Sequence, residues 1–565
     1  MRMAVLWGIL FVTINAAPAA AQTPQPAGEP PVVLSPRIGV ALGAPRALTL
    51  EEAIRLTLEE NNDVSISRLE TAAAREDVRA AQGIFDPRLV PTLTYQRSTT
   101  ASASAIGGAT NGAFDQNQLA GALVLDGRTP WAGGRFNVDF TATRLESGNQ
   151  FARLNPQFPS SLGASVIQPL LRGRAVDAER RQIEIARRAA DLTDAQLSQV
   201  VMDQLTLVEE AYWNLVFAVR NLEVQTQALA QAQAQVTSNE RQSQGGTLAP
   251  IDVVEAQIQA SNFRQATASA QQSLTEAENR LKSLMTSTRT ADIWNQPLAP
   301  AEIADRARPA LSLDDAVRLA LVRRPELAAL DTVRARNQID QRFFRDQAKP
   351  RFDLVGSYSL SGLAGGPLVS TGDPLGGTDA AFLARLNELS LRAGLPAVDT
   401  PPSTGATVPD FFVGGYGASL GNILARRFPS ALVQLQIDLP IRNTTARAGI
   451  ARAGIVGNQI ARQRQQLEQA IEVEVRNALQ AVQSSHERLD ASSSARRNAL
   501  EQYESERRRF EAGLSTVFLV LERQTALVTA QAQELRARAD LNQAIAFLDR
   551  ATGGTLERHG VKLTA

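Results

Sequence analysis

The feature that most constrains the fold is a very long helical pattern at residues 172–285. Its apolar side chains alternate at spacings of three and four, which is typical of a coiled-coil seam: Leu205, Val208, Tyr212, Leu215, Val219 and Leu222. About 70 residues before a break at 245–250 contain no internal proline, so at 1.5 Å per residue this helix would extend on the order of 100 Å. A helical hairpin of that length predicts a spacer, a wall or a tube rather than a compact enzyme domain.

A second helical hairpin is expected at 450–551. Its break lies at 510–516, where the sequence reads Phe-Glu-Ala-Gly-Leu-Ser-Thr. Its returning arm repeats the spacings of four and three at Leu521, Thr525, Val528, Ala532, Leu535 and Ala539. The chain therefore holds two similar hairpins, one in each half.

The two halves also begin alike, which indicates an internal two-fold repeat. Residues 48–56 read Leu-Thr-Leu-Glu-Glu-Ala-Ile-Arg-Leu, and 311–319 read Leu-Ser-Leu-Asp-Asp-Ala-Val-Arg-Leu. Thr49 and Ser312 are plausible N-caps, and each is followed by acidic residues that suit a first helical turn. We expect a first repeat at 47–300 and a second at 301–565. They would open with helices 48–84 and 312–347.

Between the opening helix and the hairpin, each half changes to an alternating pattern. Such strands are about 10 residues long, enough to cross a bilayer when tilted. The clearest candidates lie at 88–98, 161–170, 351–360 and 431–441. The competing interpretation, a half-buried sheet of a soluble protein, fits poorly beside helices this long. We therefore favour four membrane-crossing strands per chain.

Two further segments leave the strand number open. Residues 117–126 and 135–145 also alternate, and the sequence does not decide whether this hairpin joins a barrel or stands on an outer loop. The second half instead carries a long Gly- and Pro-rich stretch at 361–427, with a short helix expected near 380–395. A loop of that length suits the mouth of a barrel better than a compact domain.

The N-terminus reads as an export signal at 1–21. Arg2 supplies the charge, residues 3–16 form the apolar core, and three alanines at 19–21 give the cleavage site. A Pro-rich tether follows at 22–46. No later stretch is apolar enough for a transmembrane helix. With no cysteine and a net charge of zero, disulfides, thiolate chemistry and a general attraction for nucleic acid are excluded.

Nothing in the sequence predicts an enzyme. The only two histidines, His486 and His559, are far apart and neither begins a metal-binding spacing. We expect no catalytic, cofactor-binding or metal-ligating residues and no cofactor.

The aromatic pair Tyr212 and Trp213 follows the helical seam and is expected to pack in the core. Trp131, Tyr95 and Tyr358 are candidates for an interfacial aromatic belt.

The layout resembles the TolC family of outer-membrane efflux and secretion channels over nearly the whole mature chain. The residues that carry the resemblance are the two openings, 168–173 (Gln-Pro-Leu-Leu-Arg-Gly), 211–215 (Ala-Tyr-Trp-Asn-Leu) and the two hairpin turns, the second reading Arg-Phe-Glu-Ala-Gly-Leu at 509–514. The resemblance implies an α+β membrane protein. Its long coiled-coil hairpins would form a periplasmic α-barrel, and three chains would share one transmembrane β-barrel.

The same resemblance implies a homotrimer in the outer membrane of a Gram-negative bacterium. It would work with a periplasmic adaptor (membrane fusion) protein and an inner-membrane pump, as the exit duct of a tripartite efflux pump or a type I secretion system. Two physical arguments also require an oligomer. Two hairpins from one chain cannot close a tube, and an open strand edge is not tolerated in lipid. A non-channel periplasmic coiled-coil scaffold is the alternative. The transported substance, and the choice between drug or metal efflux and protein secretion, cannot be read from the sequence.

Site residues follow from the two hairpin tips. The expected adaptor contacts are Gly245, Gly246, Thr247, Leu248, Gly513, Leu514, Ser515 and Thr516. The family often narrows the periplasmic entrance with carboxylates just past the second tip. Here Leu519 occupies the first such position and Glu522 the second, so a single acidic ring is expected, with Phe518 as an apolar constriction and Asp252 as a further gate candidate.

Overall fold

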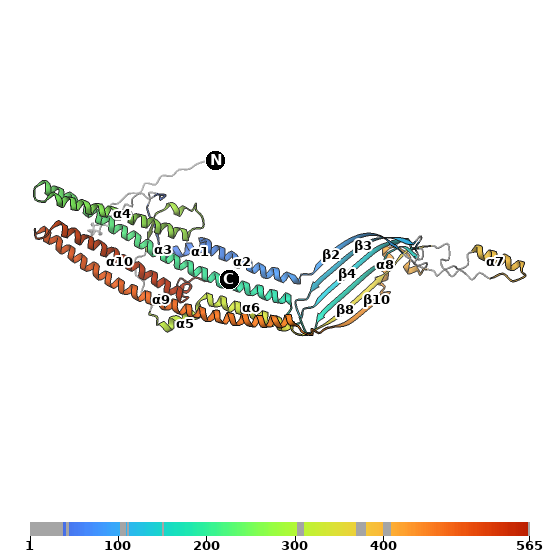
Figure 1. Ribbon diagram of the computed structural model, residues 1–565. Helices are drawn as coiled ribbons and strands as arrows, with labels where there is room; N and C mark the ends of the chain where they lie inside the picture. Colours follow the sequence, from blue (N-terminus) through green and yellow to red (C-terminus); the bar gives the residue numbers. More distant parts are fainter. Residues whose placement is uncertain are drawn as a thin grey trace, which may run out of the picture.

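The structure is a computed structural model of the chain. The structure describes residues 38–40, 44–101, 109, 112–149, 152–301, 310–368, 380–398 and 408–562. The expected export signal at 1–21 and most of the tether at 22–46 lie outside these residues. Figure 1 shows a long arm of helices continued end to end by a curved sheet of strands, with the small helix α7 at the far end.

Four helices much longer than the average make up the arm. They are α3 (Ala178–Gln244), α4 (Pro250–Met285), α9 (Thr444–Glu511) and α10 (Val517–Ala551). At 1.5 Å per residue, the 67 residues of α3 and the 68 of α9 each extend about 100 Å. The arm is completed by α1 (Leu50–Glu60), α2 (Asn62–Gln82), α5 (Leu313–Arg323), α6 (Pro325–Gln347) and the short α11 (Thr555–Arg558).

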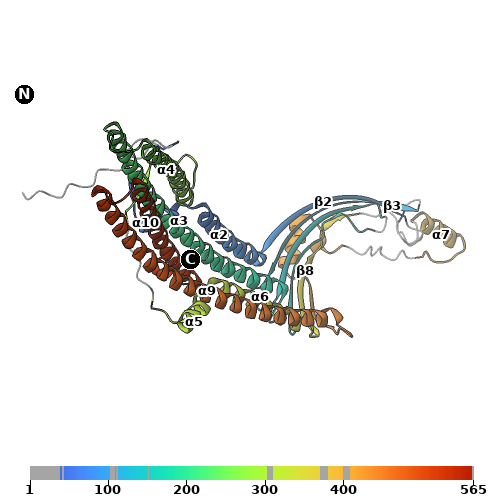
Figure 2. The ribbon, with the colours of Figure 1, turned by 60° about the vertical axis from the view of Figure 1, so that its left-hand side comes forward.

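These helices pack side by side as four lanes. Towards the hairpin tips, α4 packs against α3, α3 against α10, and α10 against α9. Towards the sheet, α2 takes the outer place beside α3, while α6 lies between α3 and α9. Figures 1 and 2 show α2 in line with α4 and α6 in line with α10, while α5 stands beside α9. One chain thus forms a curved wall four helices wide.

Each opening helix is broken, which corrects the expectation of continuous helices at 48–84 and 312–347. Asn61 ends α1 in an extended conformation, and its side chain accepts hydrogen bonds from the backbone N–H groups of Asp63 and Val64. In the second repeat, Pro325 begins α6 and holds Arg324 in an extended conformation, because a residue before proline avoids helical dihedrals. The hairpins also begin at different residues than expected, at Ala178 instead of 172 and Thr444 instead of 450.

Six long strands form the main path of one antiparallel sheet in the order β10-β8-β6-β4-β3-β2, and two short strands, β5 and β9, also pair within it. They are β2 (Arg88–Ala101), β3 (Ala113–Arg128), β4 (Arg135–Ser147), β6 (Ser160–Pro169), β8 (Arg351–Gly362) and β10 (Phe428–Asp438). The sheet of one chain thus contains six long strands, where four strands were expected. The hairpin that the sequence left unplaced, β3 and β4, lies inside the sheet between β2 and β6, because its backbone pairs on both sides.

Smaller elements lie at the two ends of the sheet and beside the helices. Within 361–427 the structure places β9 (Gly365–Pro367), α7 (Ala380–Arg392), η3 (Asp410–Phe412) and α8 (Tyr416–Leu424), and β9 pairs with β5 (Leu154–Gln157). The remaining elements are β1 (Arg46–Leu48), which runs parallel to β7 (Leu298–Pro300), η1 (Gly83–Phe85) and η2 (Asp292–Asn295). None of the helices in the described residues is long and apolar enough to cross a membrane.

The largest apolar core lies where α1, α3 and α4 meet. Tyr212 and Trp213 are both buried there, as expected, and Tyr212 donates a hydrogen bond from its hydroxyl to the carbonyl of Leu48 at 3.2 Å. A separate core joins α5, α9 and α10 around Ile471 and Ile545. The observed combination of long helical hairpins, an antiparallel sheet and an internal repeat confirms the expected fold class.

Candidate functional site

The sheet has one apolar and one polar face, and the register carries both across all six strands. One row of directly opposed residues is apolar throughout: Pro91, Leu123, Phe140, Leu162, Leu360 and Pro429. A row on the other face is almost entirely polar: Arg88, Asp126, Asn137, Ser165, Ser357 and Leu432. This alternation is the pattern of a membrane barrel that turns its apolar face to lipid and its polar face to a lumen.

Among the residues that the structure describes, no strand pairs with the outer edge of β2 or of β10. All residues of β10 and nearly all of β2 are exposed, whereas those of the inner strands are mostly half-buried. Tyr95 and Tyr358 stand exposed on the apolar face, and Trp131 is exposed in the turn between β3 and β4. Their place in an aromatic belt remains a prediction.

The two hairpin tips are built in the same way. Gly246 and Gly513 have φ angles of +77° and +75°, a left-handed conformation that glycine adopts without steric cost. In both tips, the residue after the left-handed glycine donates a backbone hydrogen bond to a carbonyl at the end of the preceding helix. Thr247 N–H donates to the carbonyl of Gln242 at 2.9 Å, and Leu514 N–H donates to the carbonyl of Arg509 at 2.8 Å. This is the hydrogen bonding of a Schellman-type helix end.

The predicted adaptor-contact residues differ in whether their side chains are already engaged in contacts within the chain or are exposed to a partner. Thr247 donates its hydroxyl to the carbonyl of Gln242, Thr516 caps α10, and Ser515 bonds to Glu506. Leu248 and Phe510 of the other tip both pack against a small apolar cluster that includes Val517 and Leu521. Leu514, in contrast, is 71% exposed and points its apolar side chain into solvent at the end of the arm.

The three gate candidates lie on two helices. Phe518, which is 58% exposed, and Glu522 stand four residues apart and therefore share one exposed face of α10. Asp252 lies in the first turn of α4 and is half-buried. The two helices are joined near this level by a hydrogen bond of 2.7 Å from Gln259 to Thr525.

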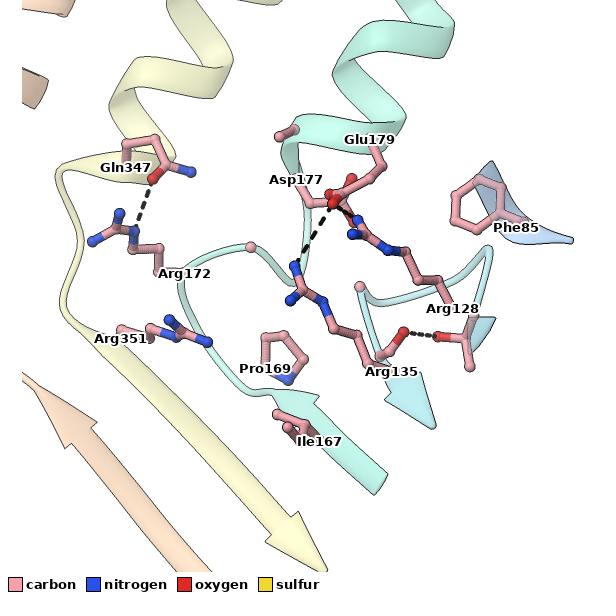
Figure 3. A pocket seen from close by; sticks show the side chains of 15 residues that line it. Phe85, Arg128, Arg135, Ile167, Pro169, Arg172, Asp177, Glu179, Gln347 and Arg351 are labelled. Atoms are coloured by element: carbon pink, nitrogen blue, oxygen red, sulfur yellow. Dashed lines mark hydrogen bonds and ion pairs between the residues drawn. The ribbon is translucent and has the colours of Figure 1, made fainter. Parts of the chain in front are cut away.

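A cleft of about 230 Å³ marks the junction between sheet and helices. Figure 3 shows its charged lining. Glu179 at the start of α3 forms ion pairs with Arg128 and, at 3.6 Å, with Arg135, the two residues that flank the β3–β4 turn. On the other side, Arg172 donates to the side chain of Gln347 at 2.9 Å. These contacts fix the direction in which the sheet leaves the helices.

A charge network ties four helices together at the break between α5 and α6. Arg550 on α10 pairs with Asp203, Glu474 and Glu326 at 2.8, 3.0 and 3.2 Å. Arg324, which is 4% exposed, pairs with Glu326 and Glu474. Burial raises the pKa of the Asp203 carboxyl above its usual value, and the charge of Arg324 opposes this shift. This network could not be predicted from the sequence, because its members come from four distant segments of the chain.

The family model for outer membrane efflux proteins matches residues 136–287 and 415–554, which is more than half of the chain. The chain belongs to the outer membrane efflux protein family. This confirms the resemblance to TolC-like channels, and it identifies the molecule as an efflux channel rather than a non-channel scaffold. The efflux protein resides in the outer membrane of a Gram-negative cell and extends into the periplasm.

Solved membrane-protein structures share the fold of this efflux protein. A membrane protein from Pseudomonas aeruginosa has 18% identity and a TM-score of 0.59, with 89% of this chain and 92% of that one covered. The Campylobacter jejuni CmeC outer membrane channel has 14% identity and a TM-score of 0.58, covering 90% and 86%. VceC from Vibrio cholerae has 14% identity and a TM-score of 0.56, covering 89% and 96%. No curated protein matches the sequence.

Proposed function

We propose that three copies of this efflux channel assemble into a continuous duct, the exit component of a tripartite efflux pump or type I secretion system. The duct conducts substrates passively from an inner-membrane pump and a periplasmic adaptor to the exterior. The observation that carries the proposal is the pair of open edges, β2 and β10, on a sheet with a continuous apolar face.

Unpaired edges of this kind cannot persist in lipid. Each edge presents backbone N–H and C=O groups, and leaving such a group without a partner in hydrocarbon costs several kcal/mol. β2 runs away from the helices and β10 runs back to them, so β2 of one copy and β10 of the next meet antiparallel. Closing the sheet on further copies satisfies both edges at once. The number three rests on the family resemblance.

The helical wall needs the same closure. Its outer lane carries exposed apolar side chains along α2, at Ile66 and Leu69, and along α4, at Ile251, Val254 and Ile258. The last three are spaced by three and four residues and so share one helix face. A neighbouring copy packed against this lane would cover them and complete an α-barrel tunnel through the periplasm.

The hairpin tips dock the adaptor in this proposal, and Leu514 is the central contact. Its exposed apolar side chain lies at the extreme end of the arm, whereas Leu248 already packs between the two tips. We expect Leu514→Arg to abolish efflux in cells while the trimer still forms, and Leu514→Met to retain efflux. Efflux that survives Leu514→Arg at equal protein levels would remove Leu514 from the docking surface.

The entrance is narrowed by Phe518 and Glu522 in this proposal, with Asp252 as a secondary contributor. Three Glu522 carboxylates converging on one axis favour cations, because a ring of like charges selects its counter-ion. In planar bilayers, Glu522→Gln is expected to reduce cation selectivity measured by reversal potential, and Glu522→Asp to keep it. Identical reversal potentials for the wild type and both variants would place Glu522 outside the conduction path.

Assembly is tested with cysteine pairs, which are clean probes because the chain has no cysteine of its own. One cysteine replaces Thr92, Thr94 or Gln96 on β2, and the other replaces Gln434 or Gln436 on β10. Oxidation should produce covalent dimers and trimers in outer-membrane fractions for the pairs in register, while single variants stay monomeric on heated gels. A purified protein that remains a monomer in detergent and in vesicles, with no interchain disulfide, would exclude the shared barrel.

A further inference from the structure

We propose that the β3–β4 hairpin is part of the barrel wall, so that six strands from each of three copies form a barrel of eighteen strands. The inference rests on the proposed trimer. The inference goes beyond the trimer because a barrel of eighteen strands has an exit pore about as wide as the helical tunnel below the barrel. Strand pairing, the faces of the hairpin, its anchoring and the perimeter of the assembly support it.

Strand pairing places the hairpin inside the wall. β2 is paired with β3 along its whole length, from Arg88 opposite Asp126 to Ala101 opposite Ala113. On its other side, β4 pairs with β6 from Arg135 opposite Ile167 to Ala142 opposite Ser160. Removing the hairpin from the wall would break both ladders and require β2 to pair with β6.

The faces of the hairpin match those of its neighbours. Leu123 and Phe140 continue the apolar row from Pro91 to Leu162, and Leu125 and Val138 continue the next one. On the other face, Asp126, Asn137 and Asp139 are polar. A hairpin on an outer loop in water would not need one apolar face in register with the lipid-facing rows, so this alternation indicates a membrane-crossing segment.

The hairpin turn is anchored where the sheet meets the helices. Gln168 on β6 donates to the carbonyl of Ala132 at 2.8 Å, and Arg128 and Arg135 pair with Glu179 on α3 (Figure 3). Gly133 has a φ of +66° and lies against the carbonyl of Gly173, where a side chain would not fit. The turn is therefore seated at the periplasmic end of the sheet, the end at which the other strands join the arm.

The perimeter of the assembly fits eighteen strands. Four helical lanes from each of three copies give twelve helices, which at about 10 Å spacing make a ring about 120 Å around. Strands about 4.8 Å apart and tilted by about 40° each occupy about 6 Å, so eighteen cover about 110 Å and twelve only about 75 Å. The wider barrel, about 35 Å across between strand axes against about 25 Å, continues the tunnel without narrowing it.

It follows that the barrel does not limit the size of the cargo. A solute that has passed along the helical tunnel meets no narrower wall in a barrel of this width. Porin-type barrels with 16–18 strands already leave an aqueous channel. The inference thus assigns the extra hairpin a role in letting bulky substrates leave.

Single cysteines test which way the hairpin faces. In the assembled channel, Ala122→Cys on the polar face should react with a charged, membrane-impermeant thiol reagent. Leu123→Cys, one residue further on, should be protected by lipid. Equal labelling of both cysteines at the rate of a solvent-exposed control would place the hairpin in water and overturn the inference.

Cysteine pairs test the strand order directly. The hydroxyls of Thr141 and Ser161 lie 2.7 Å apart on β4 and β6, so Thr141→Cys with Ser161→Cys should form an intrachain disulfide detectable by mass spectrometry of digested trimers. Thr92→Cys with Ser161→Cys should not, because β3 and β4 separate them. The reverse result would mean that β2 pairs with β6 and the barrel has four strands per copy.

Electron cryomicroscopy of the trimer gives the final measurement, with a barrel about 35 Å across expected and one about 25 Å across contradicting the inference. Failure of the proposed function is distinguishable, because it appears as the absence of trimers and of β2–β10 disulfides. A trimer with those disulfides and a narrow barrel would overturn only the eighteen-strand inference.

Discussion

Arg324 illustrates how much of the arm depends on single buried side chains. It lies at the break between α5 and α6 and joins carboxylates of α6 and α9. We expect Arg324→Ala to lower the free energy of unfolding by about 3 kcal/mol, because removing one partner of a buried charge network leaves the others uncompensated. Thermal unfolding followed by circular dichroism in detergent measures the change.

The neighbouring Arg323 provides the matched control. Its pair with Glu557 is solvent-exposed, and exposed pairs contribute about 0–1 kcal/mol. Arg323→Ala should therefore unfold close to the wild-type temperature. Equal losses in the two variants would mean that burial of Arg324 does not matter.

Asp203 gives the same network a dependence on pH. Its pKa is raised from 3.8 in the folded protein, so the folded state holds this proton more tightly than the unfolded state. Stability from this group is therefore present at low pH and is lost as pH rises from about 3.8 through the higher folded value. The unfolding temperature should therefore change with pH in the mildly acidic range, and Asp203→Asn should remove the part of that change that Asp203 causes.

An exposed aspartate on the same helix serves as the comparison. Asp194 pairs with Arg75 at 3.4 Å in a solvent-exposed position. The variant Asp194→Asn is expected to keep the wild-type pH slope. A slope that Asp203→Asn leaves unchanged would show that Asp203 does not couple folding to pH.

At the scale of elements, the hairpin tips depend on one glycine conformation each. Gly246 is left-handed at φ +77°, while Gly245 beside it is right-handed at φ −77°. We expect Gly246→Ala to weaken the tip by about 1 kcal/mol, because a Cβ is disfavoured in the left-handed region. Gly245→Ala should be nearly neutral. Hydrogen–deuterium exchange of the 244–250 amides measures both, and faster exchange in Gly245→Ala alone would contradict the assignment.

Element boundaries also separate what was predictable from what was not. The long hairpins follow from the spacing of Leu205 to Leu222 and from two Gly-containing turns. The breaks in the opening helices were missed although Asn61 and Pro325 are local signals. Each is a single residue inside a strong helical pattern, and the helical periodicity on both sides of it favours a continuous helix.

At the scale of the whole molecule, the lipid-facing surface should tolerate no charge. Leu123→Arg places a cation on the apolar face of β3, and such a substitution costs about 2–4 kcal/mol near the bilayer midplane. Ala122→Arg lies on the polar face and should insert normally. The yield of folded trimer in outer-membrane fractions measures the difference, and equal yields would argue against a membrane position for β3.

The sequence by itself determined the architecture of this efflux channel. Periodicity is a local property, so the helical hairpins, the alternating strands and the two-fold repeat can be read without coordinates. What only the tertiary structure decided depends on contacts between distant segments. Pairing of β3 with β2 and of β4 with β6 set the strand number of the sheet. Leu248 packs against the cluster that includes Val517 and Leu521, whereas Leu514 stays exposed. Arg324 and Arg550 meet their carboxylates across four helices. An alternating segment looks the same whether it pairs inside a wall or stands apart, because its partners are chosen by register and not by its own residues.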